Sequence, residues 1–124
     1  MKVDSFFLNI TSEDPERLFA FYRDIVGLTP KPEMGEWSLD MGGATLGIDG
    51  HSGTRGPAKE PTRWLPNLFV ESIDAEQKRL EDQGVKFIRN QGKEFWGGVI
   101  STFVDPDGNY AQLIEYRPQP APAK

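Results

Sequence analysis

Few side chains in this sequence are suited to nucleophilic or soft-metal chemistry. The chain has one histidine, His51, and no cysteine. The lack of cysteine excludes a disulfide framework, a thiolate nucleophile and a Cys-ligated metal site. His51 stands in a glycine-rich segment without an obvious acidic partner or a nucleophile elbow beside it, so no hydrolytic triad is indicated. A lone histidine in such a segment is most often a solvated surface residue.

Carboxylates and a phenol are the remaining groups that could move protons or hold a hard metal ion. Asp4, Asp40 and Asp49 could form an all-carboxylate metal site, although acids beside turns are more commonly just exposed. Glu115, Asp49 and Tyr110 are candidates for proton transfer, which needs the group within about 3 Å of a ligand atom. No sequence feature selects one of them, so a metal-free enzyme stays open as an alternative.

The size and charge of the chain limit what it can be. Its 124 residues, 37% hydrophobic and 27% charged, suit one globular domain. The net charge of −5 and the scattered lysines and arginines argue against nucleic acid as a partner. No stretch has the length of a membrane span or of a secretory leader's apolar region, so a cytoplasmic location and no membrane partner are expected.

The chain divides into two halves with the same order of elements. In module one, residues 1–49, the pattern predicts a strand over 3–10, a helix over 14–25 ended by Gly27, and strands over 37–41 and 44–48. Residues 50–63 are rich in glycine and proline and predict a linker. In module two, residues 64–117, strands are expected over 65–70, 85–88, 95–104 and 109–116, with a helix over 74–83. Residues 118–124 form a proline-rich tail.

Matching residues support a duplication of one unit. A shift of 60 positions lays Leu8 on Leu68 and Ser12 on Ser72. A shift of 65 lays Gly43 on Gly108, each in an Asp-x-x-Gly turn that precedes the last strand of its half. These matches fall at caps and turns, where backbone geometry demands particular residues.

Two segments carry recognisable motifs: LFAFYRDIVGL at residues 18–28 and FVDPDGNYAQLIE at residues 103–115. They resemble those of a known family, the vicinal oxygen chelate superfamily of glyoxalases, bleomycin-resistance proteins and extradiol dioxygenases. The resemblance covers roughly residues 1–117. It implies an α+β fold of two tandem βαβββ modules, which form a partly rolled mixed sheet around a cavity.

The resemblance also points to four positions where metal-dependent members hold their ion. In this chain they are occupied by Ser5 and Leu65 on the first strands and by Gly47 and Gln112 on the last strands. A catalytic divalent metal needs several converging imidazoles or carboxylates. These four residues do not supply them, so no metal and no other cofactor is expected.

The same family geometry selects the side chains expected to line the cavity. They combine aromatic and aliphatic surface with amides and a hydroxyl, as in many small-molecule pockets. Trp37, Phe95 and Trp96 add flat surfaces that could stack on a ring or attract a cation. The expected ligand-binding residues are Ser5, Phe7, Asn9, Trp37, Asn67, Phe69, Phe95, Trp96, Tyr110, Gln112 and Ile114.

The leading hypothesis is therefore a metal-free protein that binds a small aromatic or cationic molecule, as the antibiotic-sequestering members of the family do. The resemblance implies a homodimer as well. The alternative is a metal-dependent lyase or isomerase of the glyoxalase type, or a dioxygenase, with bound Zn, Ni, Mn or Fe.

Overall fold

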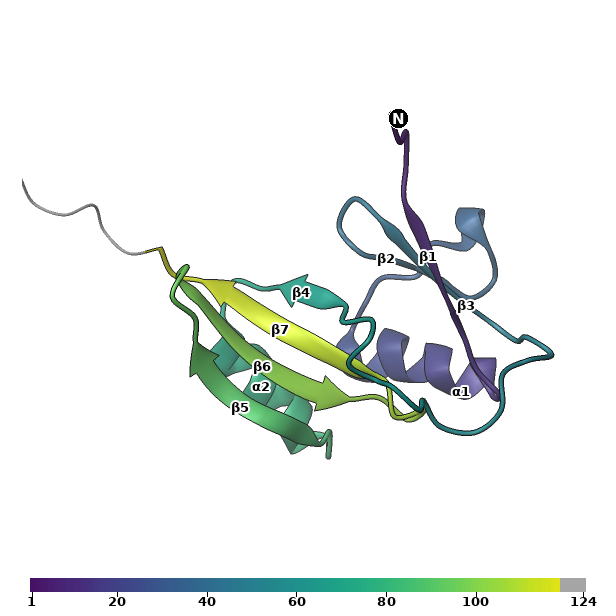
Figure 1. Ribbon diagram of the computed structural model, residues 1–124. Coiled ribbons are helices and arrows are strands. Elements are labelled where there is room, and N and C mark those ends of the chain that lie inside the picture. The colour runs from purple at the N-terminus through teal and green to yellow at the C-terminus, as the bar shows by residue number, and fades with distance from the viewer. Residues whose placement is uncertain (119–124) are drawn as a thin grey trace, which may run out of the picture. The chain divides into compact units, whose positions relative to one another are not determined.

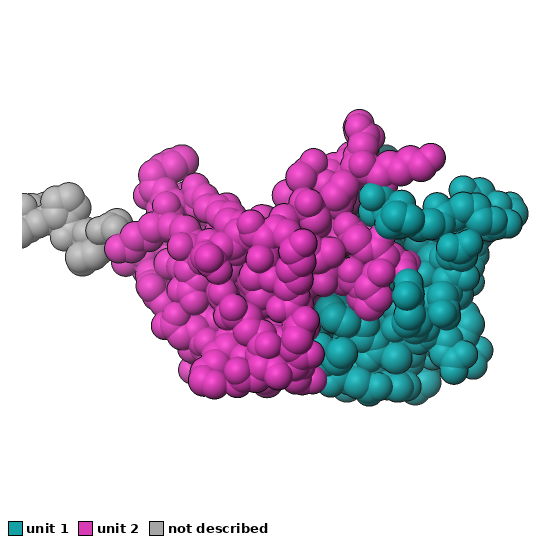
Figure 2. Space-filling view, turned by 90° about the horizontal axis from the view of Figure 1, so that it is seen from below, with its two compact units in different colours: residues 1–58 teal, residues 59–124 magenta. Residues whose placement is uncertain are grey.

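The structure is a computed structural model that describes residues 1–118 of the chain. It separates into two compact units, residues 1–58 and residues 59–124, which are shown in different colours in Figure 2. The division falls inside the segment predicted as a linker. The predicted tail lies, beyond Pro118, outside the described residues.

The first unit contains a three-stranded mixed sheet and one helical segment (Figure 1). The strands are β1 (Phe7–Thr11), β2 (Ser38–Asp40) and β3 (Thr45–Asp49), in the order β1-β3-β2. β1 runs parallel to β3, and β2 runs antiparallel to it. Between β1 and β2 lie the helix α1 (Pro15–Ala20), its π-helical continuation η1 (Phe21–Val26) and the 3₁₀ turn η2 (Pro32–Met34).

The helical segment of the first unit begins and ends at residues with the expected local chemistry. The carboxylate of Asp14 accepts the backbone N–H of Arg17 at 3.2 Å, and Pro15 occupies the first turn. At the other end Gly27 has φ = 89°, a left-handed conformation that glycine adopts without a Cβ clash. The predicted helix over 14–25 is confirmed, and α1 packs against β3.

The second unit contains a four-stranded mixed sheet with one helix on one face (Figure 1). Its elements are β4 (Asn67–Phe69), α2 (Ile73–Asp82), β5 (Phe87–Lys93), β6 (Gly98–Val104) and β7 (Tyr110–Tyr116). The strand order is β4-β7-β6-β5, with only the β4–β7 pair parallel. α2 packs on β6 and β7 and buries Ile73 and Leu80 beside Phe103 and Leu113.

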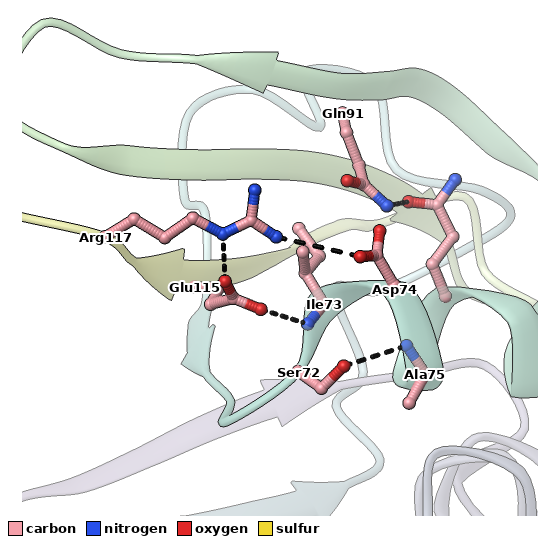
Figure 3. Close-up of polar contacts among 8 residues, drawn as sticks. Ser72, Ile73, Asp74, Ala75, Gln91, Glu115 and Arg117 are labelled. Atoms are coloured by element: carbon pink, nitrogen blue, oxygen red, sulfur yellow. Dashed lines mark hydrogen bonds and ion pairs between the residues drawn. The ribbon is translucent and has the colours of Figure 1, made fainter.

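Both ends of α2 carry specific contacts, and its start is tied to the end of β7 (Figure 3). The Ser72 hydroxyl caps the helix by accepting the backbone N–H of Ala75 at 3.2 Å. A carboxylate oxygen of Glu115 accepts the N–H of Ile73 at 3.0 Å, and Arg117 donates to the other oxygen of Glu115. After the helix, Gly84 has φ = 85° and ends it as predicted.

The two units share one topology, with two differences. One strand pair of the second unit is reduced to a single bridge in the first, and the first strands correspond at a different sequence shift from the one predicted. In the first unit an isolated antiparallel bridge between Pro30 and Leu39 stands where β5 pairs with β6 in the second. Asn9 pairs with Gly47, and Asn67 pairs with Gln112. Because Gly47 and Gln112 are 65 positions apart, Asn9 matches Asn67 at a shift of 58, and the predicted shift of 60 is wrong for the first strands. The helix caps agree, since Asp14 takes the place of Ser72.

Three predicted strand boundaries are also wrong. β1 begins at Phe7 rather than at residue 3, because its partner β3 starts at Thr45, the residue that pairs with Phe7. β5 continues to Lys93 instead of ending at 88. β6 begins at Gly98 rather than at 95. Residues 95–97 form a turn instead, which is closed by a hydrogen bond from the Glu94 N–H to the Gly98 carbonyl. The predicted α+β class and the two βαβββ modules are confirmed.

Candidate functional site

A pocket of about 270 Å³ lies within the first unit, on the sheet face opposite α1. Alternation along the strands defines this face. Leu39 and Leu46 are buried on the α1 side, and the paired residues Asn9, Gly47 and Ser38 point the other way. The pocket is lined by Phe7, Asn9, Met34, Gly35, Glu36, Trp37, Ser38, Gly47, Ile48 and Asp49.

The floor of the pocket is built on Gly47, a buried glycine in the central strand. A Cβ added at Gly47 would lie 2.3 Å from Cζ of Phe7 and 3.1 Å from Oδ1 of Asn9. The phenyl ring and the amide therefore occupy the space above the strand that a side chain at this position would fill. A glycine inside a strand often marks such a close approach.

The wall of the pocket is formed by residues 34–37, from the last residue of η2 to the residue before β2. The carbonyl of Trp37 accepts the N–H of Ile48 at 2.9 Å, which joins this segment to β3. Gly35 approaches the buried Ser38 so closely that a Cβ would lie 2.9 Å from the Ser38 hydroxyl oxygen. These two contacts hold Met34, Glu36 and Trp37 at the edge of the pocket.

The lining combines an indole, a phenyl ring and negative charge. Glu36 and Asp49 both line the pocket, and among the residues that line it there is no lysine or arginine. One carboxylate oxygen of Asp49 accepts the N–H of Gly50 at 2.8 Å, which fixes its position near the end of β3. Such a lining can stack on a ring and attract a positive charge.

The structure brings together three residues that the sequence predicted for ligand binding in the first half: Phe7, Asn9 and Trp37. Ser5 is not among the lining residues and is exposed, because β1 starts two residues after it. The sequence prediction did not include Met34, Glu36 or Ser38. The signal that could have found them is their position within three residues of Trp37, in the stretch from the end of η2 to the start of β2.

The predicted residues that belong to strands of the second unit lie on the sheet face opposite α2. Glu115 faces α2, so Gln112, Ile114 and Tyr110 face away from it. The Gln112 side-chain amide donates to Oδ1 of Asn67 at 3.3 Å. Phe69, which pairs with Ile114, is 66% exposed. The structure therefore brings these residues to one surface.

Phe95 and Trp96 lie outside the strands, in the turn between β5 and β6. Phe95 is 96% exposed. Trp96 covers Gly98, where a Cβ would lie 2.1 Å from its ring, and stacks on Tyr116 with ring centroids 6.2 Å apart. Tyr116 was not among the predicted site residues, although it continues the alternation of Gln112 and Ile114.

The donor set does not fit the divalent metal that the family resemblance implies. Among residues 1–118, no group of three or more His, Cys, Asp or Glu side chains lies close enough to hold an ion. Of the four positions, Gly47 and Leu65 offer no side-chain donor, Ser5 offers only a hydroxyl, and Gln112 offers a neutral amide. His51 is exposed, and its Nδ1 accepts the N–H of Gly53 at 2.9 Å, which closes a local turn.

Comparison with known proteins identifies the family. The sequence model of the Glyoxalase/Bleomycin resistance protein/Dioxygenase superfamily matches residues 4–113. The chain therefore belongs to this superfamily, and the resemblance to vicinal oxygen chelate proteins is confirmed. A search of curated proteins found no significant match.

Solved structures of the same superfamily share the fold. A glyoxalase family protein from Bacillus anthracis is 24% identical, with a TM-score of 0.72 over 94% of this chain and 98% of that chain. A glyoxalase/bleomycin resistance protein/dioxygenase family enzyme from Burkholderia phytofirmans PsJN is 19% identical, with a TM-score of 0.74 over 92% of this chain and 99% of that chain. At such identities the likeness shows the fold alone. In the described residues no helix is long and apolar enough to cross a membrane.

Proposed function

We propose that this chain is a metal-free member of the superfamily that binds a small aromatic or cationic molecule in the pocket of residues 1–58. The observation that carries the proposal is the lining of that pocket. It places Trp37 and Phe7 beside Glu36 and Asp49 and contains no basic side chain. A ring with a positive charge would satisfy both the aromatic surface and the carboxylates.

Sequestration is the form of activity that this lining supports, because binding alone needs no catalytic group. An antibiotic with a charged ring system is one ligand of this kind. The proposal includes a homodimer, as the family resemblance implies, and a cytoplasmic location. The metal-dependent alternative requires converging ligands, which the side chains of residues 1–118 do not supply.

The proposal can be tested with a matched pair of small probes. Benzylammonium carries a ring and a charge, whereas benzyl alcohol carries the ring alone. A ligand that binds the folded state raises its melting temperature. We expect benzylammonium to raise the melting temperature more than benzyl alcohol does, and related aromatic cations of larger size to extend the effect.

Variants then locate the binding. Trp37→Ala and Glu36→Gln should each weaken benzylammonium binding by roughly three- to tenfold, as expected for loss of a cation–π contact or of a nearby charge. Glu33→Gln makes the same charge change three residues away, outside the lining, and should leave binding unchanged. Equal binding by wild type and Trp37→Ala would refute the site. Stoichiometric metal in the purified protein, measured by mass spectrometry, would refute the metal-free assignment.

A further inference from the structure

A row of polar side chains crosses all four strands of the second unit, on the face opposite α2. The pairing register places Asn67 beside Gln112, Gln112 beside Thr102, and Thr102 beside Arg89. A β-bulge between Phe87 and Arg89 turns Arg89 to this face, since Phe87 packs on Phe103 on the α2 side. The next row along the same face is apolar: Phe69, Ile114, Ile100 and Gly92.

Two amides form the outer end of the polar row. Gln112 donates to Asn67 at 3.3 Å, and this is the one hydrogen bond of both side chains within residues 1–118. An amide has two N–H donors and a carbonyl with two lone pairs. The pair therefore retains both a donor and an acceptor for a ligand. Exchanging the N and O positions of both amides leaves the same combination, so the conclusion does not depend on their assignment.

The polar row offers a ligand no unpaired charge. Arg89 is its only charged member, and its guanidinium donates to Glu94 at 2.7 Å. A carboxylate ligand would provide acceptors alone, and an ammonium would provide donors alone. Either would leave part of the amide pair unmatched, which weakens binding. A neutral group with a donor and an acceptor side by side matches both amides.

An aromatic ring lies next to the amides. Phe69 follows Asn67 by two residues on the same face of β4 and is 66% exposed, while its partner Ile114 is 3% exposed. A planar ligand can thus place its polar edge on the amides and its face on Phe69. The lining of the pocket of residues 1–58 does not provide this combination.

We propose that Asn67, Gln112 and Phe69 form a recognition site for a neutral cyclic amide or imide. The amides take the place of the family's metal ligand at Gln112 and recognise the N–H and C=O edge directly. The site shares no residue with the pocket of residues 1–58, so each of the two binding proposals can fail independently of the other.

The test uses glutarimide and N-methylglutarimide, which differ only in the N–H of the polar edge. The side-chain amide signals of Asn67 and Gln112 are followed in nitrogen-15 NMR spectra of the whole chain. Glutarimide should shift both signals in a saturable way, with a Kd of about 1 mM for so small a ligand. N-methylglutarimide should shift them little. The amide of Gln83, exposed after α2, is the internal control and should not respond.

Gln112→Met keeps the length of the side chain and removes its amide, and should weaken glutarimide binding about fivefold. Its own spectrum reports whether it is folded. Gln83→Met makes the same chemical change at an exposed amide after α2 and should bind glutarimide like wild type. Absence of a saturable shift, or equal shifts with the methylated probe, would overturn the proposal. An unchanged affinity in folded Gln112→Met would do the same.

Discussion

Glu115 near the end of β7 accepts the backbone N–H of Ile73 in the first turn of α2, at 3.0 Å (Figure 3). The N–H groups of a first helical turn have no partner within the helix, and a carboxylate there also interacts favourably with the helix dipole. Arg117 donates to the second oxygen of Glu115 and lies 3.7 Å from Asp74. One carboxylate thus joins the last strand to the helix that covers it.

This contact predicts a pH-dependent contribution to stability. The guanidinium of Arg117, and then the N–H of Ile73, hold the pKa of Glu115 below its ordinary value of 4.5. Because the folded pKa is the lower one, the ionised carboxylate stabilises the fold above the ordinary value. This contribution is lost as the pH falls through the folded value.

The measurement is denaturant unfolding of wild type and Glu115→Gln between about pH 7 and pH 3. We expect wild type to be more stable at neutral pH and the difference to shrink below about pH 4.5. Glu81→Gln, an exposed acid on α2, is the control and should show no such change. A difference between wild type and Glu115→Gln that stays constant across this range would contradict the assignment.

Helix boundaries could be predicted from the sequence because their causes are local. Asp14 with Pro15 begins the first helical segment, and Gly27 and Gly84 end the two helices through positive φ angles. Each signal acts within a few residues of the boundary it sets.

The register between the two halves could not be predicted in this way. The shifts of 60 and 58 differ by two residues, and a slip of two leaves every side chain on the same face of a strand. The alternation of buried and exposed side chains therefore cannot reveal the error. Only the pairing of Asn9 with Gly47 and of Asn67 with Gln112 settles which residues correspond.

Residues 89–94 were not predicted as a strand because their sequence, RNQGKE, is polar and contains a glycine. In the structure they belong largely to β5, the edge strand of its sheet, where polar side chains and bulges are common. The position of the pocket wall could not be predicted either, because no local signal sets it. The position of residues 34–37 depends on the contact of Trp37 with Ile48, which is distant in sequence.

Removal of the N-cap of α2 gives a second prediction. Ser72→Ala deletes the hydroxyl that accepts the N–H of Ala75 and should lower the free energy of unfolding by about 1 kcal/mol. Ser52→Ala makes the same change in an exposed loop and should have almost no effect. Denaturant unfolding of both variants checks this. An equal loss in both would mean that the Ser72 contact contributes nothing.

Two phenylalanines allow the stability contribution of a buried ring to be compared with that of an exposed one. Phe103 is fully buried, whereas Phe95 is 96% exposed. Phe103→Ala should cost about 3–5 kcal/mol, because it removes a large buried side chain and leaves a cavity. Phe95→Ala should cost less than about 0.5 kcal/mol. Thermal unfolding distinguishes them, and a large loss for Phe95→Ala would show that this side chain is buried in solution.

Gly47 and Phe7 should act as a coupled pair in the pocket. A Cβ at Gly47 would lie 2.3 Å from the end of the Phe7 ring, which is too close for any real contact. Phe7 is 43% exposed, so its ring can swing aside at modest cost. We therefore expect Gly47→Ala to fold and to lose benzylammonium affinity, since the displaced ring and the added methyl group alter the floor.

A double-mutant cycle measures this coupling. In Phe7→Ala/Gly47→Ala the methyl group added at position 47 has room. The free energy of unfolding that the double variant loses should therefore be smaller than the sum of the two single losses, by about 0.5–2 kcal/mol. Gly50→Ala is the control, because a Cβ there would make ordinary contact with Pro15 at 3.8 Å. Strictly additive losses would show that the Phe7 ring does not rest on Gly47 in solution. The pocket floor would then have a different shape from the one on which the binding proposal rests.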